Sequence, residues 1–231
     1  MSNTAEPRGP RQAAWSRAET VEGFARGTAN GVLLQWMDRE RSRRAVRRVL
    51  DIGCGAARNA VPLARAGIEV VGVDTAMPML TAALARGIAE GAATPLRLAR
   101  ANMDALPLPD RSVDAVIAHG VWNLAGSGEQ FRRAVREAAR VARPDAGLFL
   151  FTFSRHTLSP AATPVPGETF VFTQFSGEPQ CFLTEAEVLA ELAAGGFVRD
   201  PGGPLTEYNR PAGPAQMATG PVIYEGTFRK R

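Results

Sequence analysis

From residue 46 onward the chain alternates short runs of β-branched residues with stretches of helical periodicity, and this alternation restricts the possible folds more than any other feature. Strands that alternate with helices of about ten to fifteen residues form right-handed βαβ units, whose strands lie parallel in one sheet. The expected strands are Val46–Leu50, Glu69–Val73, Leu96–Ala99, Val113–Ala118 and Leu148–Phe153, and the expected helices are Ala57–Ala66, Met77–Ala89 and Glu129–Ala142. The sequence therefore predicts an α/β fold with a doubly wound, mostly parallel sheet.

The segments that flank this alternation are expected to fold differently. Residues 1–45 combine a tail containing Pro and Gly with helical periodicity over 12–30 and again from 32 to 47, which we interpret as a helical lid. Residues 46–231 form one domain, in which the proline-rich segment 154–181 is an insertion after the fifth strand, of the kind that closes over a site. Two final strands, 205–209 and 222–228, have no helix between them and should pair antiparallel.

Composition and charge exclude several classes of protein. The 231 residues are 45% hydrophobic and 22% charged, as in ordinary globular domains, and two cysteines provide neither a disulfide framework nor a metal site. The net charge of +4 divides into +5 over residues 1–48 and −1 over the rest, which disfavours a nucleic-acid partner. No run is long and apolar enough for a membrane span or a signal peptide, so we expect no membrane association and a cytoplasmic protein.

The glycine-containing turn after the first strand indicates a nucleotide-like cofactor. Asp51-Ile52-Gly53-Cys54-Gly55 runs from a buried strand through two glycines into a helix, and glycine allows the close approach of a ligand. The next strand ends at Asp74, where a carboxylate can accept hydrogen bonds from a ribose diol. Arg58 occupies the position of the last glycine of the dinucleotide fingerprint and argues against NAD. The acidic Asp51 favours a cofactor with a positive charge, such as S-adenosylmethionine.

Several ordered blocks over residues 46–153 resemble the class I S-adenosylmethionine-dependent methyltransferases, and in particular their small-molecule branch. The third block, Asn102 to Asp114, contains Leu106-Pro107-Leu108-Pro109-Asp110 and matches a pattern of that branch. The resemblance implies a Rossmann-like methyltransferase fold and S-adenosylmethionine as cofactor. Ala57, where the family commonly has a third glycine, and Asn102, in place of the usual aspartate, depart from the pattern.

The resemblance also implies the cofactor contacts residue by residue. Asp51 would lie near the methionine end, Asp74 would hold the ribose hydroxyls, and the amide of Asn102 would accept from the adenine amine. The other implied contacts are Gly53, Cys54 and Gly55 through their backbone, Thr75 and Ala76 beside the adenine, Met103 on its ring, and His119 with Gly120 close to the transferable methyl group.

The acceptor is expected to be a small molecule, with RNA, protein or an NAD-dependent oxidoreductase reaction as alternatives. His119 is the candidate general base or substrate-orienting group, because it is the histidine at the expected strand end. The lid and the insertion are expected to supply apolar walls for the acceptor. The candidate substrate-binding residues are Trp15, Trp36, Trp122 and Phe172, with Phe170 and Phe175 as further wall residues. Burial in the core would explain each of the three tryptophans at least as well. The methylated atom and the oligomeric state stay open.

Overall fold

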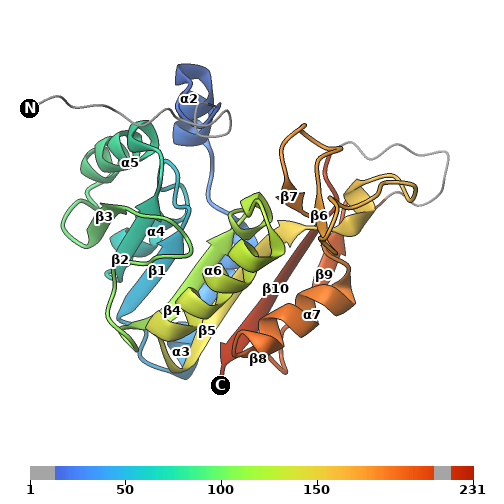
Figure 1. Cartoon of the computed structure of the whole chain (residues 1–231). Coiled ribbons are helices and arrows are strands. Elements are labelled where there is room, and N and C mark those ends of the chain that lie inside the picture. The colour runs from blue at the N-terminus through green and yellow to red at the C-terminus, as the bar shows by residue number, and fades with distance from the viewer. Residues whose placement is uncertain (1–13, 211–219) are drawn as a thin grey trace, which may run out of the picture.

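A mixed β-sheet forms the centre of the molecule (Figure 1). The computed structural model describes residues 14–210 and 220–231, and within them the sheet has eight strands in the order β3-β2-β1-β4-β5-β10-β8, with β9 also paired to β10. The strands are β1 (Arg48–Ile52), β2 (Glu69–Asp74), β3 (Leu96–Arg100), β4 (Val113–His119), β5 (Ala142–Phe153), β8 (Phe197–Arg199), β9 (Thr206–Tyr208) and β10 (Ile223–Lys230). Strands β1 to β5 are parallel and β10 is antiparallel to all its neighbours.

Helices cover both faces of this sheet, as the doubly wound prediction requires. In Figure 1 α6 and α7 lie in front of the sheet and α3 lies behind it. The helices are α3 (Gly31–Arg43), α4 (Ala60–Arg65), α5 (Met77–Ala89), α6 (Gly128–Val141) and α7 (Glu185–Ala194). Helices α3, α4 and α5 contribute to one hydrophobic cluster, and α6 and α7 contribute to the other. The α/β class and the parallel sheet are confirmed.

The period of two along the strands explains why both faces are apolar. In β1 the side chains of Leu50 and Ile52 join the cluster under α6 and α7, whereas Val49 joins the cluster under α3 and α4. In β4, Val116 and Ile117 separate in the same way. Because alternate side chains of a strand point to opposite faces, a strand buried on both sides must be apolar throughout. This requirement produces the β-branched runs of the sequence.

The C-terminal strands differ from their prediction in one respect. The antiparallel pairing of β9 with β10 is confirmed, with Tyr224 opposite Glu207. The sequence did not indicate that β10 also lies between β5 and β8, with Ile223 opposite Phe153 at one end of the β5 pairing. Helix α7 begins at a capping box, in which the Thr184 hydroxyl accepts from the Glu187 backbone N–H.

The N-terminal segment has a shorter first helix than its periodicity predicts. Helix α2 covers only Ala18–Arg26, and the chain is extended at Gly27 before α3 begins. The Asn30 side chain accepts from the backbone N–H groups of Val32 and Leu33, so it caps α3 and separates the two helices. In Figure 1 α2 lies next to α5, at the end of the sheet where the parallel strands finish.

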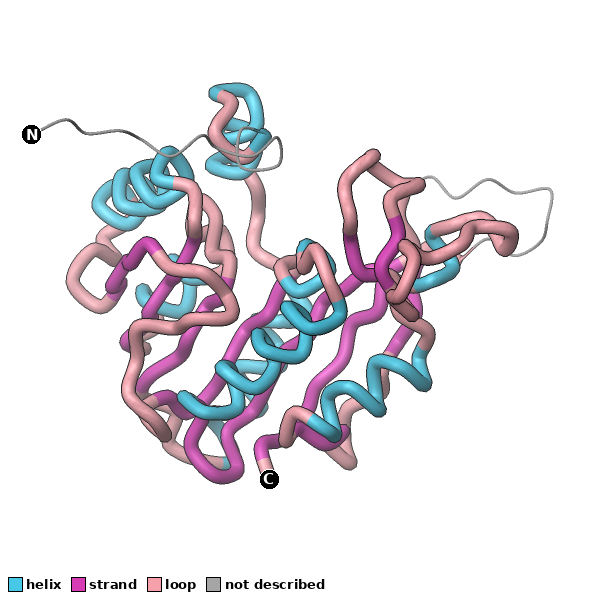
Figure 2. Tube along the Cα trace, in the orientation of Figure 1, coloured by secondary structure: helices cyan, strands magenta, loops and turns pink. Residues whose placement is uncertain are grey.

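The insertion after β5 contains short regular elements. They are η2 (Arg155–Thr157) and an antiparallel pair formed by β6 (Val171–Phe172) and β7 (Gln180–Cys181). Figure 2 shows this pair beyond the end of the main sheet, among loops. A further short helix, η1 (Trp122–Leu124), follows β4 and contacts β7. Across residues 14–210 and 220–231, no helix has the length and apolar character to span a bilayer.

Candidate active site

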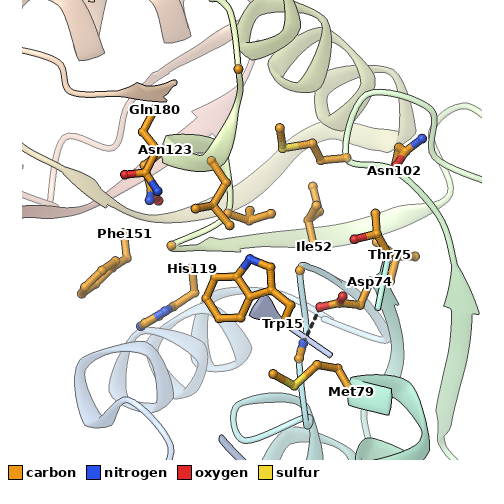
Figure 3. A pocket seen from close by; sticks show the side chains of 18 of the residues that line it. Trp15, Ile52, Asp74, Thr75, Met79, Asn102, His119, Asn123, Phe151 and Gln180 are labelled. Carbon is orange, nitrogen blue, oxygen red and sulfur yellow. Dashed lines mark hydrogen bonds between the residues drawn. The ribbon is translucent and has the colours of Figure 1, made fainter. Parts of the chain in front are cut away.

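A cavity of about 850 Å³ opens at the carboxyl ends of the parallel strands. Its wall includes Gly53 after β1, Asp74 at the end of β2, His119 at the end of β4 and Phe151 near the end of β5. Helix α2 contributes Phe24, and the insertion contributes Gln180. Figure 3 shows Asp74, Thr75 and Asn102 toward one end and Phe151, Asn123 and Gln180 toward the other. We call these ends the nucleoside half and the acceptor half.

Three residues of the turn after β1 have positive φ, and they are Gly53, Gly55 and Ala57, the last with φ of 60°. Gly53 and Gly55 have φ of 66° and 52°, a region that favours glycine. A Cβ on Gly53 would lie 2.6 Å from Cγ2 of Val121, so the turn is closed to any side chain. Backbone conformation and crowding together explain the glycine at position 53, whereas backbone conformation alone explains Gly55, where the nearest atom to an added Cβ would be 3.6 Å away. Cys54 lies behind the turn, where its N–H donates to the Val73 carbonyl at 3.0 Å, and its side chain is outside the cavity wall.

The Asp74 carboxylate fixes the same turn while it lines the cavity. One oxygen accepts from the backbone N–H of Gly55 at 3.0 Å, and the other accepts from that of Ala76 at 2.9 Å (Figure 3 shows the Asp74 side chain). A carboxylate oxygen has more than one acceptor site, so these backbone bonds orient Asp74 and leave capacity for a ligand. Ala76 itself is buried behind the cavity wall.

Asp51 is a buried acid without a hydrogen-bond partner for one of its oxygens. Asp51 Oδ2 has no hydrogen-bond partner among the described residues. Asp51 is buried and lies beneath the cavity wall. Burial raises the pKa of Asp51 from 3.8 to about 7, an effect that nearby Arg58 opposes and Asp74 reinforces. An unpaired buried carboxylate stabilises a positive charge placed close to it. The site is thus suited to a cationic ligand group.

His119 is held in a neutral form by its neighbours. Because Asn30 uses its side-chain oxygen to cap α3, its amide group donates to His119 Nε2 at 3.1 Å and to Glu225 Oε2 at 2.8 Å. Nη2 of Arg58 lies 3.4 Å from His119 Nδ1, and the imidazole stacks on the Phe151 ring with the centroids 4.3 Å apart. Burial, followed by the charge of Arg58, lowers the pKa of His119 to about 4. His119 lines the cavity as predicted, but this environment opposes the general-base role.

The remaining wall of the nucleoside half contains three more of the residues that were expected to contact the cofactor. Thr75, Asn102 and Met103 all line the cavity, and Met79 on α5 joins them. Asn102 is exposed on the loop that follows β3, so its amide is accessible to a ligand edge. These residues follow the ends of β2 and β3, which lie side by side in the sheet.

The acceptor half differs from the predicted set, and three substrate-binding predictions are corrected. Trp36 belongs to α3, is 2% exposed and packs on Phe149 of β5 with the ring centroids 5.5 Å apart. Trp122 is fully buried in the cluster under α6, and Phe172 lies in a small cluster with Phe182. These side chains face the interior, so they pack the fold and do not line the cavity. The wall role expected for Phe170 is corrected for the same reason, because it is 2% exposed in that core.

Trp15 and Phe175, by contrast, line the cavity as predicted. Trp15 meets Phe24 of α2 edge to face at 5.4 Å, which brings the N-terminal segment over the cavity. The lining residues that sequence analysis missed include an arginine, three amides, a carboxylate and aromatic rings. Among them are Phe24, Arg58, Asn123, Gln130, Phe151, Phe153, Glu178 and Gln180. Arg58 was noted in the sequence only as a departure from the NAD fingerprint.

Comparison with known proteins identifies the family. Residues 50–151 match the methyltransferase domain family. A demethylmenaquinone methyltransferase of Mycobacterium bovis is 33% identical over 174 residues, which cover 71% of this chain and 68% of that protein. The chain belongs to the class I S-adenosylmethionine-dependent methyltransferases. The resemblance inferred from the motifs is confirmed, and S-adenosylmethionine is the cofactor of the family.

Other similar proteins define the extent of the likeness. A demethylmenaquinone methyltransferase of Thermus thermophilus is 39% identical over 113 residues, 48% of this chain and 49% of that protein. The chain therefore spans about half the length of the first curated relatives that it matches. The structure of the 1,6-didemethyltoxoflavin-N1-methyltransferase of Burkholderia thailandensis superposes with a TM-score of 0.65 at 19% identity, over 98% of this chain and 92% of that one. At this identity the superposition shows the fold alone.

The residues of the cavity fit the cofactor of the family. The unpaired, buried Asp51 oxygen suits the positively charged methionine end, and the Asp74 carboxylate suits the ribose hydroxyls. The closed glycine turn allows a flat ligand to lie against backbone. Asn102 and Met103 would then lie by the adenine. The individual contacts stay predictions that binding measurements must test.

Proposed function

We propose that the chain transfers the methyl group of S-adenosylmethionine to a small-molecule acceptor bound in the acceptor half of the cavity. The observation that carries this proposal is the continuity of the cavity, which joins Asp74 and Asn102 at one end to Phe151 and Gln180 at the other. A cavity of about 850 Å³ has the size of a small-molecule site. The family match supplies the reaction class.

The main contributions of the chain are to align the cofactor with the acceptor and to exclude water from the cavity. When bound, the cofactor supplies a methyl group on a sulfonium, which a nucleophilic acceptor atom attacks in line. The glycine turn and Asp74 fix the nucleoside half, and Phe151 and Phe153 shape the acceptor half. Holding two reactants at a fixed distance and angle accounts for a large share of such a rate enhancement. Trp15 and Phe24 flank the opening from the N-terminal side.

If the acceptor has to lose a proton, His119 is not favoured as the general base. Both imidazole nitrogens lie next to donor groups, Nε2 next to the Asn30 amide and Nδ1 next to the Arg58 guanidinium. A proton added to the ring would therefore face a donor group, which disfavours protonation. With a pKa of about 4, the group is a weak base at neutral pH. We propose that His119 instead orients groups at the centre of the cavity. Glu178 is the carboxylate that lines the acceptor half.

The relatives and neighbours act on different acceptors, as their names state. They include demethylmenaquinone and 1,6-didemethyltoxoflavin enzymes. A further structural neighbour, SpnF, is named a [4+2]-cyclase and superposes with a TM-score of 0.65 at 20% identity, over 89% of this chain and 84% of that one. Fold alone therefore does not assign the acceptor. The acceptor of this chain has to be inferred from its own cavity.

Transfer of a labelled methyl group tests the proposal. The purified protein is incubated with S-adenosylmethionine labelled in the methyl carbon and with a cell extract, which is then separated into metabolite, protein and nucleic-acid fractions. We expect label in the metabolite fraction, and much less with the Asp74→Asn variant at the same subsaturating concentration of cofactor. Label confined to protein or RNA would contradict a small-molecule acceptor and select one of the alternatives.

A further inference from the structure

Two side-chain amides with unpaired oxygens face the acceptor half. Asn123 belongs to η1 after β4, and Gln180 belongs to β7 of the insertion, yet they lie next to each other above Phe151 and His119 in Figure 3. Asn123 is 1% exposed and Gln180 is 8% exposed. In the part of the chain that the structure describes, neither Asn123 Oδ1 nor Gln180 Oε1 has a hydrogen-bond partner.

The two amides are held in place by the backbone that carries them. The Cys181 thiol donates to the Ala125 carbonyl at 3.4 Å, which ties β7 to the end of η1. Strand β7 is also paired with β6, and η1 is closed by the bond from Leu124 N–H to the Val121 carbonyl. Asn123 and Gln180 therefore lie on backbone that is fixed at neighbouring positions of the wall, and their side chains are buried.

A third amide at this end of the cavity, Gln130, has a paired oxygen. The Gln130 Oε1 accepts from the Gly126 N–H at 2.9 Å, so its oxygen is satisfied within the fold. Buried polar atoms in folded proteins nearly always have partners, and an exception at a cavity wall indicates a group that a ligand completes. An oxygen acceptor needs a donor, which means an O–H or N–H group on the ligand.

The rest of the acceptor half is aromatic. Phe151 stacks on the His119 imidazole with an interplanar angle of 13°, and Phe153 meets Phe175 edge to face at 5.4 Å. Phe175 is 45% exposed, although its neighbours in this wall are more buried. Flat rings bind flat, polarisable ligands through stacked and edge-to-face contacts, and a partly exposed ring is available for such contacts.

We propose that the acceptor is a planar aromatic molecule that donates a hydrogen bond, from a ring hydroxyl or a ring N–H, to the side-chain oxygens of Asn123 and Gln180. The inference rests on the proposed methyl transfer and names its substrate class. The phenylalanines hold the ring, and the two amides set its rotation about the ring axis. They therefore select which ring atom faces the transferable methyl group, and we assign Asn123 and Gln180 as specificity-determining residues.

Matched pairs of small aromatic probes test this inference. The pairs are phenol with anisole, 2-naphthol with 2-methoxynaphthalene, and indole with N-methylindole, so that the members of a pair differ by the donor hydrogen. Cyclohexanol tests the need for a ring. Binding is measured by calorimetry or ligand-observed NMR on protein saturated with S-adenosylhomocysteine. We expect the donor member to bind about three- to tenfold more tightly, as expected for one net hydrogen bond, and cyclohexanol to bind most weakly.

Amide-removing variants connect this preference to the two residues. Asn123→Leu and Gln180→Met keep the approximate volume, and each should abolish most of the donor preference while leaving the methylated probe unaffected. Neither should lower the unfolding temperature, because an unpaired buried amide is replaced by an apolar group. Gln35→Met, on the exposed side of α3, is the matched control and should keep the full preference. Phe175→Leu should weaken every aromatic probe relative to cyclohexanol.

The outcomes separate this inference from the proposed function. If S-adenosylhomocysteine binds but the donor and methylated probes bind equally, or the preference survives in both amide variants, the substrate-class inference is overturned. The same holds if no aromatic probe binds at millimolar concentration to protein that is saturated with S-adenosylhomocysteine. If S-adenosylhomocysteine itself fails to bind, the proposed function fails first.

Discussion

The two halves of the cavity are built in different ways. The nucleoside half comes from residues at the ends of adjacent parallel strands, where Gly55 and Ala76 bind the Asp74 carboxylate through their backbone N–H groups. The acceptor half brings together Asn123, Phe151 and Gln180 from three separate segments, and side-chain packing sets their positions. The difference teaches that changes in the first half should affect folding and cofactor binding together. Changes in the second should affect only the acceptor.

Gly53→Ala has the largest expected effect on stability, because it disrupts the turn on which the nucleoside half depends. The new Cβ would lie 2.6 Å from Val121 Cγ2 at a φ of 66°, so we expect a loss of about 2–4 kcal/mol in the free energy of unfolding, from left-handed strain and overpacking together. Urea unfolding measures it. Gly67→Ala is the matched control, since its φ is 84° and no atom lies within 4 Å.

The control separates the two causes of the Gly53 effect. Gly67→Ala should cost only the backbone term of about 1–2 kcal/mol. Equal losses at both positions would show that Val121 moves aside without cost, and that the close approach at Gly53 does not hold the turn.

Asp74→Asn is expected to weaken cofactor binding strongly with a smaller effect on folding. A hydrogen bond to a charged group is worth about 1.5–3 kcal/mol, so the dissociation constant for S-adenosylhomocysteine should rise about ten- to a hundredfold. Calorimetric titration gives the value. Asp104→Asn serves as control, because Asp104 pairs with Arg133 outside the cavity wall and should leave the dissociation constant unchanged. An unchanged value for Asp74→Asn would remove this residue from the cofactor contacts.

Asp51 should make cofactor affinity depend on pH. Its pKa of about 7 means that the carboxyl is mostly protonated at pH 6 and mostly ionised at pH 8. If the ionised form holds the cationic methionine end, the affinity for S-adenosylhomocysteine should rise about tenfold between these pH values. Titrations in wild type and Asp51→Asn test this, and the variant should show a flatter profile. A wild-type profile as flat as that of the variant would contradict the contact.

The same pKa predicts the pH dependence of stability. Because the folded-state pKa of Asp51 is raised, its contribution to stability is complete below the ordinary value of 3.8 and is lost as the pH rises through about 7. Asp51→Asn should therefore stabilise the protein more at pH 8 than at pH 5. Urea unfolding at both pH values measures the difference, and an opposite sign would show that Asp51 is stabilised as an anion in the folded chain.

His119 is expected to give the smallest effect. With a pKa of about 4, its imidazole should stay neutral down to pH 5, because burial and Arg58 disfavour the charged form. NMR titration of the ring resonances, assigned with His119→Gln, follows the protonation directly. Titration near pH 6.5 would contradict this environment and return His119 to the position of candidate base.

Much of the nucleoside half follows from the sequence because its determinants are local. Gly53 and Asp74 are separated along the chain by one helix, and the order of strands in a right-handed βαβ unit brings them to one edge. Cys54 was expected to contact the cofactor through its backbone and Ala76 to lie beside the adenine. Neither residue is in the cavity wall, because neighbouring residues of a tight turn point to opposite sides, and the backbone contact of Cys54 stays a prediction. The motif identifies the turn and leaves the direction of each side chain open.

The acceptor half could not be predicted in the same way. Trp36 and Trp122 looked like binding residues by type, and only their packing against the sheet shows that they fill the core. Asn123 and Gln180 gave no signal, because nothing in the chain indicates that β7 lies beside η1. The contacts that place them join residues more than fifty positions apart, as in the bond from Cys181 to Ala125.

The central claim is that this cavity holds an adenosyl cofactor, and thermal unfolding with ligand tests it most directly. S-adenosylhomocysteine at about a hundred times its dissociation constant should stabilise the fold by about 2.7 kcal/mol, which raises the midpoint by roughly 5–11 °C for a chain of this size. We predict this rise for wild type, a smaller one for Asp74→Asn at the same concentration, and none with NADH. A rise with NADH and none with S-adenosylhomocysteine would contradict the account.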